Sequence, residues 1–381
     1  MFENRPETSY KKAAEPPTQV GAAGYSLEAA SLPARGPLSR LLDTVNLRLD
    51  PPTEDDQFYP NRELYEQFVG PNVLTARSFA SPRLYISGLA ATTYHWREIH
   101  ERAHEKHGGH SEVHCLRGHD QGFFSMLGSG VEDWVKDVEE RAVAIRQATG
   151  RLPILHGHST GALVALVAVA RFGQARPGEE LCNGLILSAP PFELRQTAHR
   201  MGLIVARVMR RFSAGADFWR RFGASMDGGG LDPDIPGKEA PTARWLPVQM
   251  LLELEKLRPL AANLTKALHV PVLVLHGTND VMANWKATAA AFRRIASPDR
   301  DLVILREGRH SMMFGPHADE FETTIEQWIR SHQESFDKGD ERSVRAHMLR
   351  CLHDRWAIPE EPRFTPLPAE VTRRGWLFRW R

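Results

Sequence analysis

Six short apolar runs alternate with longer segments of helical pattern across the middle of this 381-residue chain. The runs are residues 83–87, 112–117, 151–156, 184–190, 270–277 and 301–308. Each run has the length of a strand that is buried on both faces of a sheet. Parallel strands need crossover connections, and the helical segments between the runs can supply them. The pattern therefore predicts an α/β protein with a mostly parallel central sheet and helices on both of its faces.

The segments between the runs carry their own start and stop signals. Residues 129–150 begin with a capping box, Ser129 with Glu132, and end at a glycine. Further helices are predicted over residues 160–173, 284–297 and 318–333. The long stretch between residues 190 and 270 interrupts the alternation. An insertion there lies above the carboxyl edge of the sheet, where open α/β folds bind ligands, so we expect a helical lid.

These patterns divide the chain into five parts. Residues 1–40 are rich in Ala, Pro and polar residues without periodicity, which predicts a loosely ordered arm. Residues 41–191 and 265–336 are the two halves of the core, and residues 192–264 are the lid insertion. Residues 337–381 contain a helix and a tail that is rich in basic and aromatic residues.

One strand joins the following helix through the pentapeptide Gly157-His158-Ser159-Thr160-Gly161. Gly-x-Ser-x-Gly at a strand–turn–helix corner is a nucleophile elbow, in which bulky residues two positions from the serine would collide with the neighbouring strand and helix. The serine hydroxyl is then exposed at the edge of the sheet, and the Thr160 amide at the helix start favours a developing negative charge. The motif also arises by chance, as a glycine-flanked serine in an ordinary turn. Other segments must therefore decide between the two interpretations.

A catalytic serine needs a base, and the base needs an orienting acid, in the chain order Ser, Asp or Glu, His for this type of elbow. Asp280 follows the run 270–277 after a Gly-Thr-Asn turn, and His310 follows the run 301–308 in a loop before a helix. Alone, Asp280 fits a helix cap or an Asx-turn, and His310 fits a surface loop histidine. Together with the elbow, the two positions predict nucleophile, acid and base.

Four stretches of the segment 84–328 carry a family resemblance; they read LRGHDQGFFS, GHSTG, PVLVLHGTNDVMAN and EGRHS. The segment resembles the α/β-hydrolases of the monoacylglycerol lipase and lysophospholipase type, which are also described as serine aminopeptidase-like. The resemblance implies an α/β-hydrolase fold. By the same resemblance Ser159 is the nucleophile, Asp280 is the acid and His310 is the base.

The resemblance also implies an oxyanion hole built from two backbone amides. One belongs to Thr160, and the other, which in the family follows a His-Gly pair closing an early strand, falls on Leu89. Ser87 replaces the usual histidine of that pair, and Asp120 stands where the family prefers glycine. Because Ser87 replaces the histidine, the family pattern specifies Leu89 less strongly. Asp120 in place of glycine is expected to alter the loop beside the site.

The function implied by the resemblance is hydrolysis of carboxylic esters through an acyl-enzyme on Ser159. Lipid-like substrates of the monoacylglycerol or lysophospholipid type are expected, and the reaction needs no metal or organic cofactor. Two alternatives stay open: an acyltransferase or thioesterase with the same triad, and a non-catalytic binding protein with the same fold. The complete Ser, Asp and His set argues against the binding protein, which has no need for all three.

Charge and composition limit the partners. A net charge of +1 with 25% charged residues gives no basis for nucleic-acid binding. Arginines gather in residues 195–223, and the tail 372–381 combines Arg with Trp and Phe, so lid or tail could contact an anionic membrane surface. A lid helix packed on the core with a solvated basic face is the favoured alternative.

No secretory signal or membrane span is evident, and three scattered cysteines predict reduced thiols, so a cytoplasmic protein is expected.

Four histidines form a separate candidate site at residues 104, 107, 110 and 114. Their spacing suggests metal ligands, but Gly108 and Gly109 would break any helix that presented them together. No carboxylate or cysteine pattern completes a site. We therefore expect a solvated loop here and no metal.

Overall fold

The computed structural model describes most of the middle of the chain and several short strands outside it. The described residues are 47–48, 58–59, 72–76, 80–119, 122–195, 223–225, 242–243, 245–337, 364–366 and 377–380. The expected N-terminal arm, residues 1–40, lies outside the described residues. So does most of the C-terminal part, including the predicted helix.

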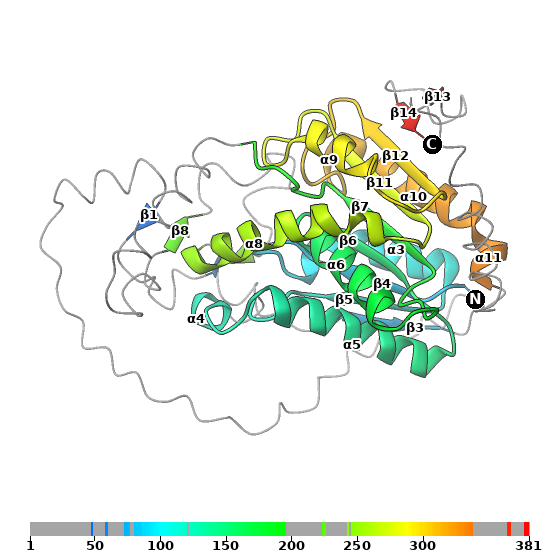
Figure 1. Ribbon diagram of the computed structural model, residues 1–381, viewed down its shortest axis with the longest axis horizontal. Helices are drawn as coiled ribbons and strands as arrows, with labels where there is room; N and C mark the ends of the chain where they lie inside the picture. Colours follow the sequence, from blue (N-terminus) through cyan, green and yellow to red (C-terminus); the bar gives the residue numbers. More distant parts are fainter. Residues whose placement is uncertain are drawn as a thin grey trace, which may run out of the picture.

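A nine-stranded sheet forms the centre of this described part (Figure 1). Its strands are β3 (Asn72–Thr75), β4 (Arg83–Ile86), β5 (His110–His114), β6 (Ile154–His158), β7 (Gly184–Ser188), β11 (Val272–Gly277), β12 (Arg300–Leu305), β13 (Phe364–Pro366) and β14 (Leu377–Trp380). Their spatial order is β13-β14-β12-β11-β7-β6-β4-β5-β3. The strands from β12 to β5 in this order pair in parallel, whereas β3, β13 and β14 pair antiparallel at the edges. The predicted mostly parallel sheet is confirmed.

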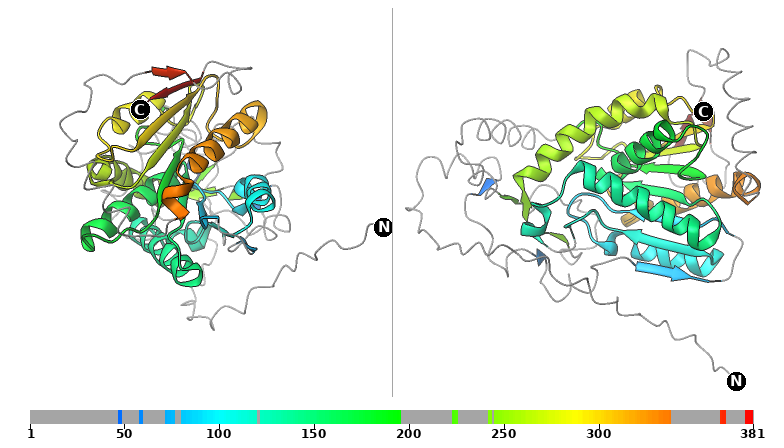
Figure 2. Two further views of the ribbon diagram at one scale, coloured as in Figure 1. Left: turned by 90° about the vertical axis from the view of Figure 1, so that its right-hand side faces the viewer. Right: turned by 60° about the horizontal axis from the view of Figure 1, so that its bottom comes forward.

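Helices cover both faces of the sheet, and the alternation of side chains along each strand explains why. The longer helices are α3 (Arg97–His107), α5 (Val131–Thr149), α6 (Thr160–Ala175), α8 (Val248–Leu264), α9 (Trp285–Phe292) and α10 (Ala318–Ser331). In β11, Val272 and Val274 join the core under α5, α6 and α8. Leu273 and Leu275 join the core under α3 and α10. Figure 2 shows these two sets of helices on opposite sides of the sheet.

Shorter elements complete the described structure. They are α4 (Phe123–Met126), α11 (Gln333–Asp337), the 3-10 segments η2 (Thr93–Trp96), η5 (Thr265–Ala267) and η6 (Gly315–His317), and the strands β1 (Leu47–Arg48), β2 (Phe58–Tyr59), β8 (Gly223–Ser225), β9 (Thr242–Ala243) and β10 (Trp245–Pro247). Strands β1, β8 and β10 form one small sheet, and β2 pairs with β9. Within the described residues, no helix has the length and apolar character needed to cross a membrane.

Helix α8 belongs to the segment 192–264 that we expected to be a lid. It packs on α6, and its buried residues Met250, Leu254 and Leu257 join the main core. The rest of the expected lid falls mostly on residues 196–222 and 226–241, which lie outside the described residues. The arginine-rich stretch is among them, so the lid and its contact with a membrane stay predictions.

The start of α5 differs from the prediction by one residue. Gly130 precedes the helix, and its amide donates to the Asp133 carboxylate at 3.0 Å. The predicted capping box of Ser129 and Glu132 is therefore wrong. The Ser129 hydroxyl instead donates to the carbonyl of Arg117 at 2.7 Å, because the chain before α5 folds back on the loop after β5.

The histidine-rich stretch is not the solvated loop that we expected. His104 and His107 lie in α3, whereas His110 and His114 lie in β5. The intervening Gly108 has φ 63°, a left-handed value that lets the chain turn directly from helix to strand. Among the described residues, no three His, Cys, Asp or Glu side chains are grouped so that they could hold a metal ion.

Candidate active site

The turn between β6 and α6 holds Ser159 in a strained backbone conformation. Its φ of 53° and ψ of −124° lie in a region that non-glycine residues rarely adopt. The Ser159 amide donates to the carbonyl of Ser188 in β7 at 2.8 Å, and the Ala162 amide donates to the Ser159 carbonyl at 3.0 Å. These bonds hold the half-buried serine between the sheet and the helix.

Three glycines let other backbone segments approach this turn. A Cβ on Gly157 would lie 2.5 Å from the carbonyl oxygen of Gly161, and a Cβ on Gly161 would lie 2.5 Å from that of Ser87. Neither distance is tolerable, because the opposing atoms are backbone. A Cβ on Gly88 would lie 3.0 Å from the Cβ of Ser159, which places the end of β4 directly against the serine.

The structure brings together the three side chains that the sequence suggested. The Ser159 Oγ lies 2.9 Å from Nε2 of His310, and the His310 Nδ1 lies 2.7 Å from Oδ2 of Asp280. Asp280 follows β11 and His310 follows β12, so the two loops leave neighbouring parallel strands at the same edge of the sheet. In this arrangement the imidazole can take the hydroxyl proton while the carboxylate stabilises the resulting imidazolium.

Asp280 is fully buried and surrounded by hydrogen-bond donors. Its Oδ1 accepts from the amides of Met282 and Ala283, both at 2.8 Å. Its Oδ2 faces His310 and also the Nε2 of His276, which is 3.0 Å away. Burial raises the pKa of Asp280, but the two histidines outweigh burial and hold this pKa well below its usual range. The carboxylate is therefore ionised wherever the protein is folded near neutral pH.

His158, the residue before the serine, contacts the backbone of His310. Its Nε2 lies 3.0 Å from the carbonyl oxygen of His310 and can donate to it. Burial lowers the pKa of His158 to about 3, so the ring is neutral at physiological pH. The elbow motif leaves this position free, and no sequence signal singled it out.

The two amides expected to form the oxyanion hole belong to segments beside Ser159. Thr160 is buried at the first position of α6. Leu89 directly follows Gly88, which abuts the serine. The buried Ser87 hydroxyl donates to the carbonyl of Thr92 at 3.2 Å, so the serine that replaces the family's histidine closes the loop that contains Leu89. Asp120, the other departure from the family pattern, lies outside the described residues.

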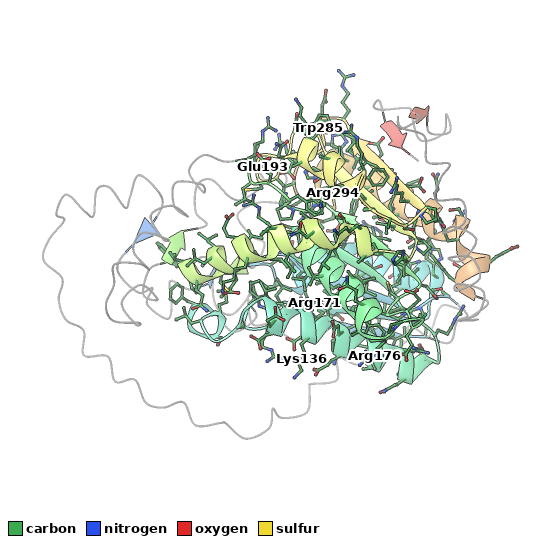
Figure 3. The ribbon with its side chains drawn as sticks, in the orientation of Figure 1. Lys136, Arg171, Arg176, Glu193, Trp285 and Arg294 are labelled. Carbon is green, nitrogen blue, oxygen red and sulfur yellow. The ribbon has the colours of Figure 1, made fainter. Side chains whose placement is uncertain are left out.

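The segment that follows β7 is hydrogen-bonded to the loop that contains Asp280. The Arg195 guanidinium donates to the carbonyl of Asp280 at 2.9 Å, and the Arg195 amide donates to that of Met282 at 2.8 Å. The Asn284 amide donates to the carbonyl of Glu193 at 2.8 Å. Figure 3 shows Glu193 and Trp285 on the same side of the molecule. In the sequence Arg195 is recognisable only as part of a basic cluster, and no motif predicts this contact.

The sequence matches the model of one family of known proteins. Residues 116–317, more than half of the chain, match the family model described as serine aminopeptidase, S33. The matched segment contains Ser159, Asp280 and His310. No curated protein sequence matches this chain.

Solved structures with a similar fold include lipolytic enzymes. One is described with the metagenome-derived lipolytic enzymes LipS and LipT (TM-score 0.58, 16% identity, 70% of this chain and 98% of that one). A second is the monoacylglycerol lipase of Paleococcus ferrophilus (TM-score 0.54, 19% identity, 69% and 99%). A third is a soluble variant of monoglyceride lipase from Saccharomyces cerevisiae with a substrate analogue (TM-score 0.54, 18% identity, 75% and 95%). At these identities the likeness shows the α/β-hydrolase fold.

Proposed function

This chain belongs to the serine aminopeptidase family of α/β-hydrolases, and we propose that it hydrolyses carboxylic esters through an acyl-enzyme on Ser159. In this proposal His310 is the general base, Asp280 orients it, and the amides of Thr160 and Leu89 bind the oxyanion. The observation that carries the proposal is the unbroken path from Asp280 Oδ2 through His310 to Ser159 Oγ, with separations of 2.7 and 2.9 Å.

The reaction follows from this path in two steps. The Ser159 Oγ attacks the ester carbonyl carbon, its proton passes to Nε2 of His310, and the carbonyl oxygen becomes an oxyanion. When the tetrahedral intermediate collapses, the same proton passes to the leaving alcohol and an acyl-serine remains. Water, deprotonated by His310, then attacks the acyl-serine, releases the acid and returns the proton to Ser159. All proton transfers use side chains of the chain itself, so the chemistry requires no metal or cofactor.

An apolar acyl group is the substrate that the surroundings support best. Val281, next to the acid, has 43% of its surface exposed, which is unusual for a large apolar side chain among the described residues. Leu89, Phe192 and Trp285 are partly buried apolar residues from segments that adjoin the site. Two similar structures are named as monoacylglycerol or monoglyceride lipases. We therefore propose lipid-like monoesters, of the monoacylglycerol or lysophospholipid type, as the substrate class.

A panel of esters tests this function. Wild type is assayed with p-nitrophenyl acetate, butyrate, octanoate and palmitate, and with a long-chain monoacylglycerol. Ser159→Ala is assayed beside it, and Ser331→Ala serves as the matched control because its hydroxyl contacts the carbonyl of Trp328 and the Nδ1 of His332 at the end of α10. We expect activity that rises with acyl length and is absent in Ser159→Ala alone. Equal activity in Ser159→Ala would contradict the proposal.

A further inference from the structure

A second histidine, His276, lies against the acid of the proposed site. It is fully buried in β11, four residues before Asp280, and its Nε2 is 3.0 Å from Asp280 Oδ2. The chain turns sharply between the two residues. A Cβ on the intervening Gly277 would lie 2.0 Å from the carbonyl oxygen of Gly308, so the glycine lets this turn meet the loop that carries His310.

Packing alone does not account for an imidazole at this position. By hydrogen-bond geometry neither ring nitrogen of His276 has a partner among the described residues, and Nε2 lies within ion-pair distance of Asp280 Oδ2. Burying polar atoms without partners is unfavourable, and a phenyl ring would fill similar space without that cost. The polar contact that an imidazole adds here is the approach of Nε2 to the carboxylate of Asp280.

We infer that His276 is a positioning residue that acts through Asp280, by sharing Oδ2 with His310. This inference rests on the proposed function. A proton on Nε2 of His276 fixes the orientation of the carboxylate and withdraws part of its negative charge from the His310 imidazolium. Oδ1 is held by two amides, so both oxygens of Asp280 are fixed, and His310 is held where its Nε2 meets Ser159.

Two other histidines of the described part of the chain lie near this cluster and stay neutral above about pH 5. His158 from β6 and His95 from η2 are buried, and burial lowers their pKa values to about 3 and about 4. The Arg195 guanidinium, from the segment after β7, donates to the carbonyl of Asp280. A change in the acid limb of the pH profile above pH 5 therefore does not come from His158 or His95.

Two substitutions at this position separate positioning from packing. His276→Phe keeps a ring but removes the donor, whereas a glutamine side chain in His276→Gln can place its amide nitrogen near the position of Nε2. Without the donor, the full carboxylate charge acts on His310 and favours the imidazolium. We expect the acid limb of kcat/KM in His276→Phe to move to higher pH by about half a unit to one unit, and kcat to fall roughly tenfold. His276→Gln should stay close to wild type in both.

His156→Phe is the matched control. His156 is a buried histidine of β6 that pairs with the hydroxyl of Ser188 at 2.7 Å, and none of its contacts involves Asp280. The acid limb in this variant should coincide with that of wild type. If His276→Phe also keeps the wild-type limb, or if His276→Gln fails to restore it, His276 serves packing and the inference is overturned.

A second measurement does not depend on activity. Long-range ¹H–¹⁵N correlation spectra of histidine-labelled protein give the tautomer of each ring, and the spectrum of His276→Phe assigns the His276 signals. We expect the Nε2 of His276 to carry a proton. A ring protonated on Nδ1 alone would turn a lone pair toward the carboxylate and would overturn the inference. If wild type does not hydrolyse esters, the proposed function is contradicted instead. The tautomer of His276 would still decide whether it donates to Asp280.

Discussion

Two Asp–His pairs lie at opposite ends of the same two strands. Asp280 and His310 follow β11 and β12 at their carboxyl ends, whereas Asp299 directly precedes β12 and pairs with His332, which follows α10. In the first pair the second ring nitrogen faces the Ser159 hydroxyl at 2.9 Å. In the second pair it faces the carbonyl oxygen of Trp328 at 2.8 Å, which can only accept, and the Ser331 hydroxyl at 3.1 Å, whose own proton is donated to the same carbonyl.

This difference determines what each imidazole can do. His332 has an acceptor at both nitrogens, so both must donate and the ring is favoured as an imidazolium. Burial lowers the pKa of His332, but the hydrogen bond and charge of Asp299 outweigh burial and raise it overall. His310 instead meets a group that can release a proton. An Asp–His pair is therefore not sufficient for catalysis. The group that faces the second ring nitrogen decides whether the histidine forms a stable ion pair or can act as a base.

The comparison predicts opposite results for one substitution at the two sites. Asp280→Asn should lower kcat by roughly 10⁴-fold, because the amide no longer stabilises the imidazolium or fixes the ring's tautomer. Asp299→Asn makes the same chemical change at the other end of the strands and should leave kcat within about twofold. Steady-state kinetics with a p-nitrophenyl ester would measure both. Similar losses in the two variants would show that the pairs do not differ in role.

Acid should destabilise the protein through histidines that the fold keeps neutral. Burial lowers the pKa of His95 and His119 to about 4 and that of His158 to about 3. Their pKa in the unfolded chain is about 6.5, so between these limits the unfolded state binds more protons and stability falls as pH falls. We expect a loss on the order of 1 to 2 kcal/mol for each ring by pH 5.

Urea unfolding at pH 7, 6 and 5 would measure this loss. His119→Gln removes one of these rings, so its free energy of unfolding should fall less steeply with acid than that of wild type. A free energy of unfolding that is independent of pH between 7 and 5 would contradict the neutral state of these histidines.

The Asp299–His332 pair should have the opposite pH dependence and a smaller effect. Because folding raises the pKa of His332, its stabilisation is complete below about pH 6.5 and is lost as pH rises through the folded value. The difference in unfolding free energy between wild type and Asp299→Asn should be about 1 kcal/mol at pH 6 and smaller at pH 9. A difference that stays constant from pH 6 to pH 9 would show that His332 is not charged in the pair.

The sequence predicted those parts of the molecule that are determined by residues close together in the chain. Short apolar runs located the central strands, because a strand buried on both faces leaves a continuous apolar segment. The glycines around Ser159 predicted the crowded turn, since close backbone approach excludes a Cβ. Asp280 and His310 could be proposed because each follows a recognisable strand, and parallel strands end at a common edge.

Contacts made through space could not be predicted in the same way. His276 stands inside an apolar run, so it was counted with a strand, and only the turn at Gly277 brings it to the carboxylate. His158 fills a free position of the elbow, and its partner is a carbonyl 152 residues later. Arg195 belongs to a basic cluster whose charge predicts only surface contacts, although its guanidinium contacts the backbone of Asp280.

The central claim is that Ser159 is the nucleophile, and covalent labelling tests it most directly. The full chain is treated with a fluorophosphonate at neutral pH, and the modified peptide is identified by mass spectrometry, with Ser159→Ala as the comparison. We expect one adduct, on the peptide that contains Ser159, and none in the variant, because only a serine activated by His310 attacks phosphorus at an appreciable rate. An adduct of equal yield in Ser159→Ala, or one on another residue of wild type, would contradict the claim.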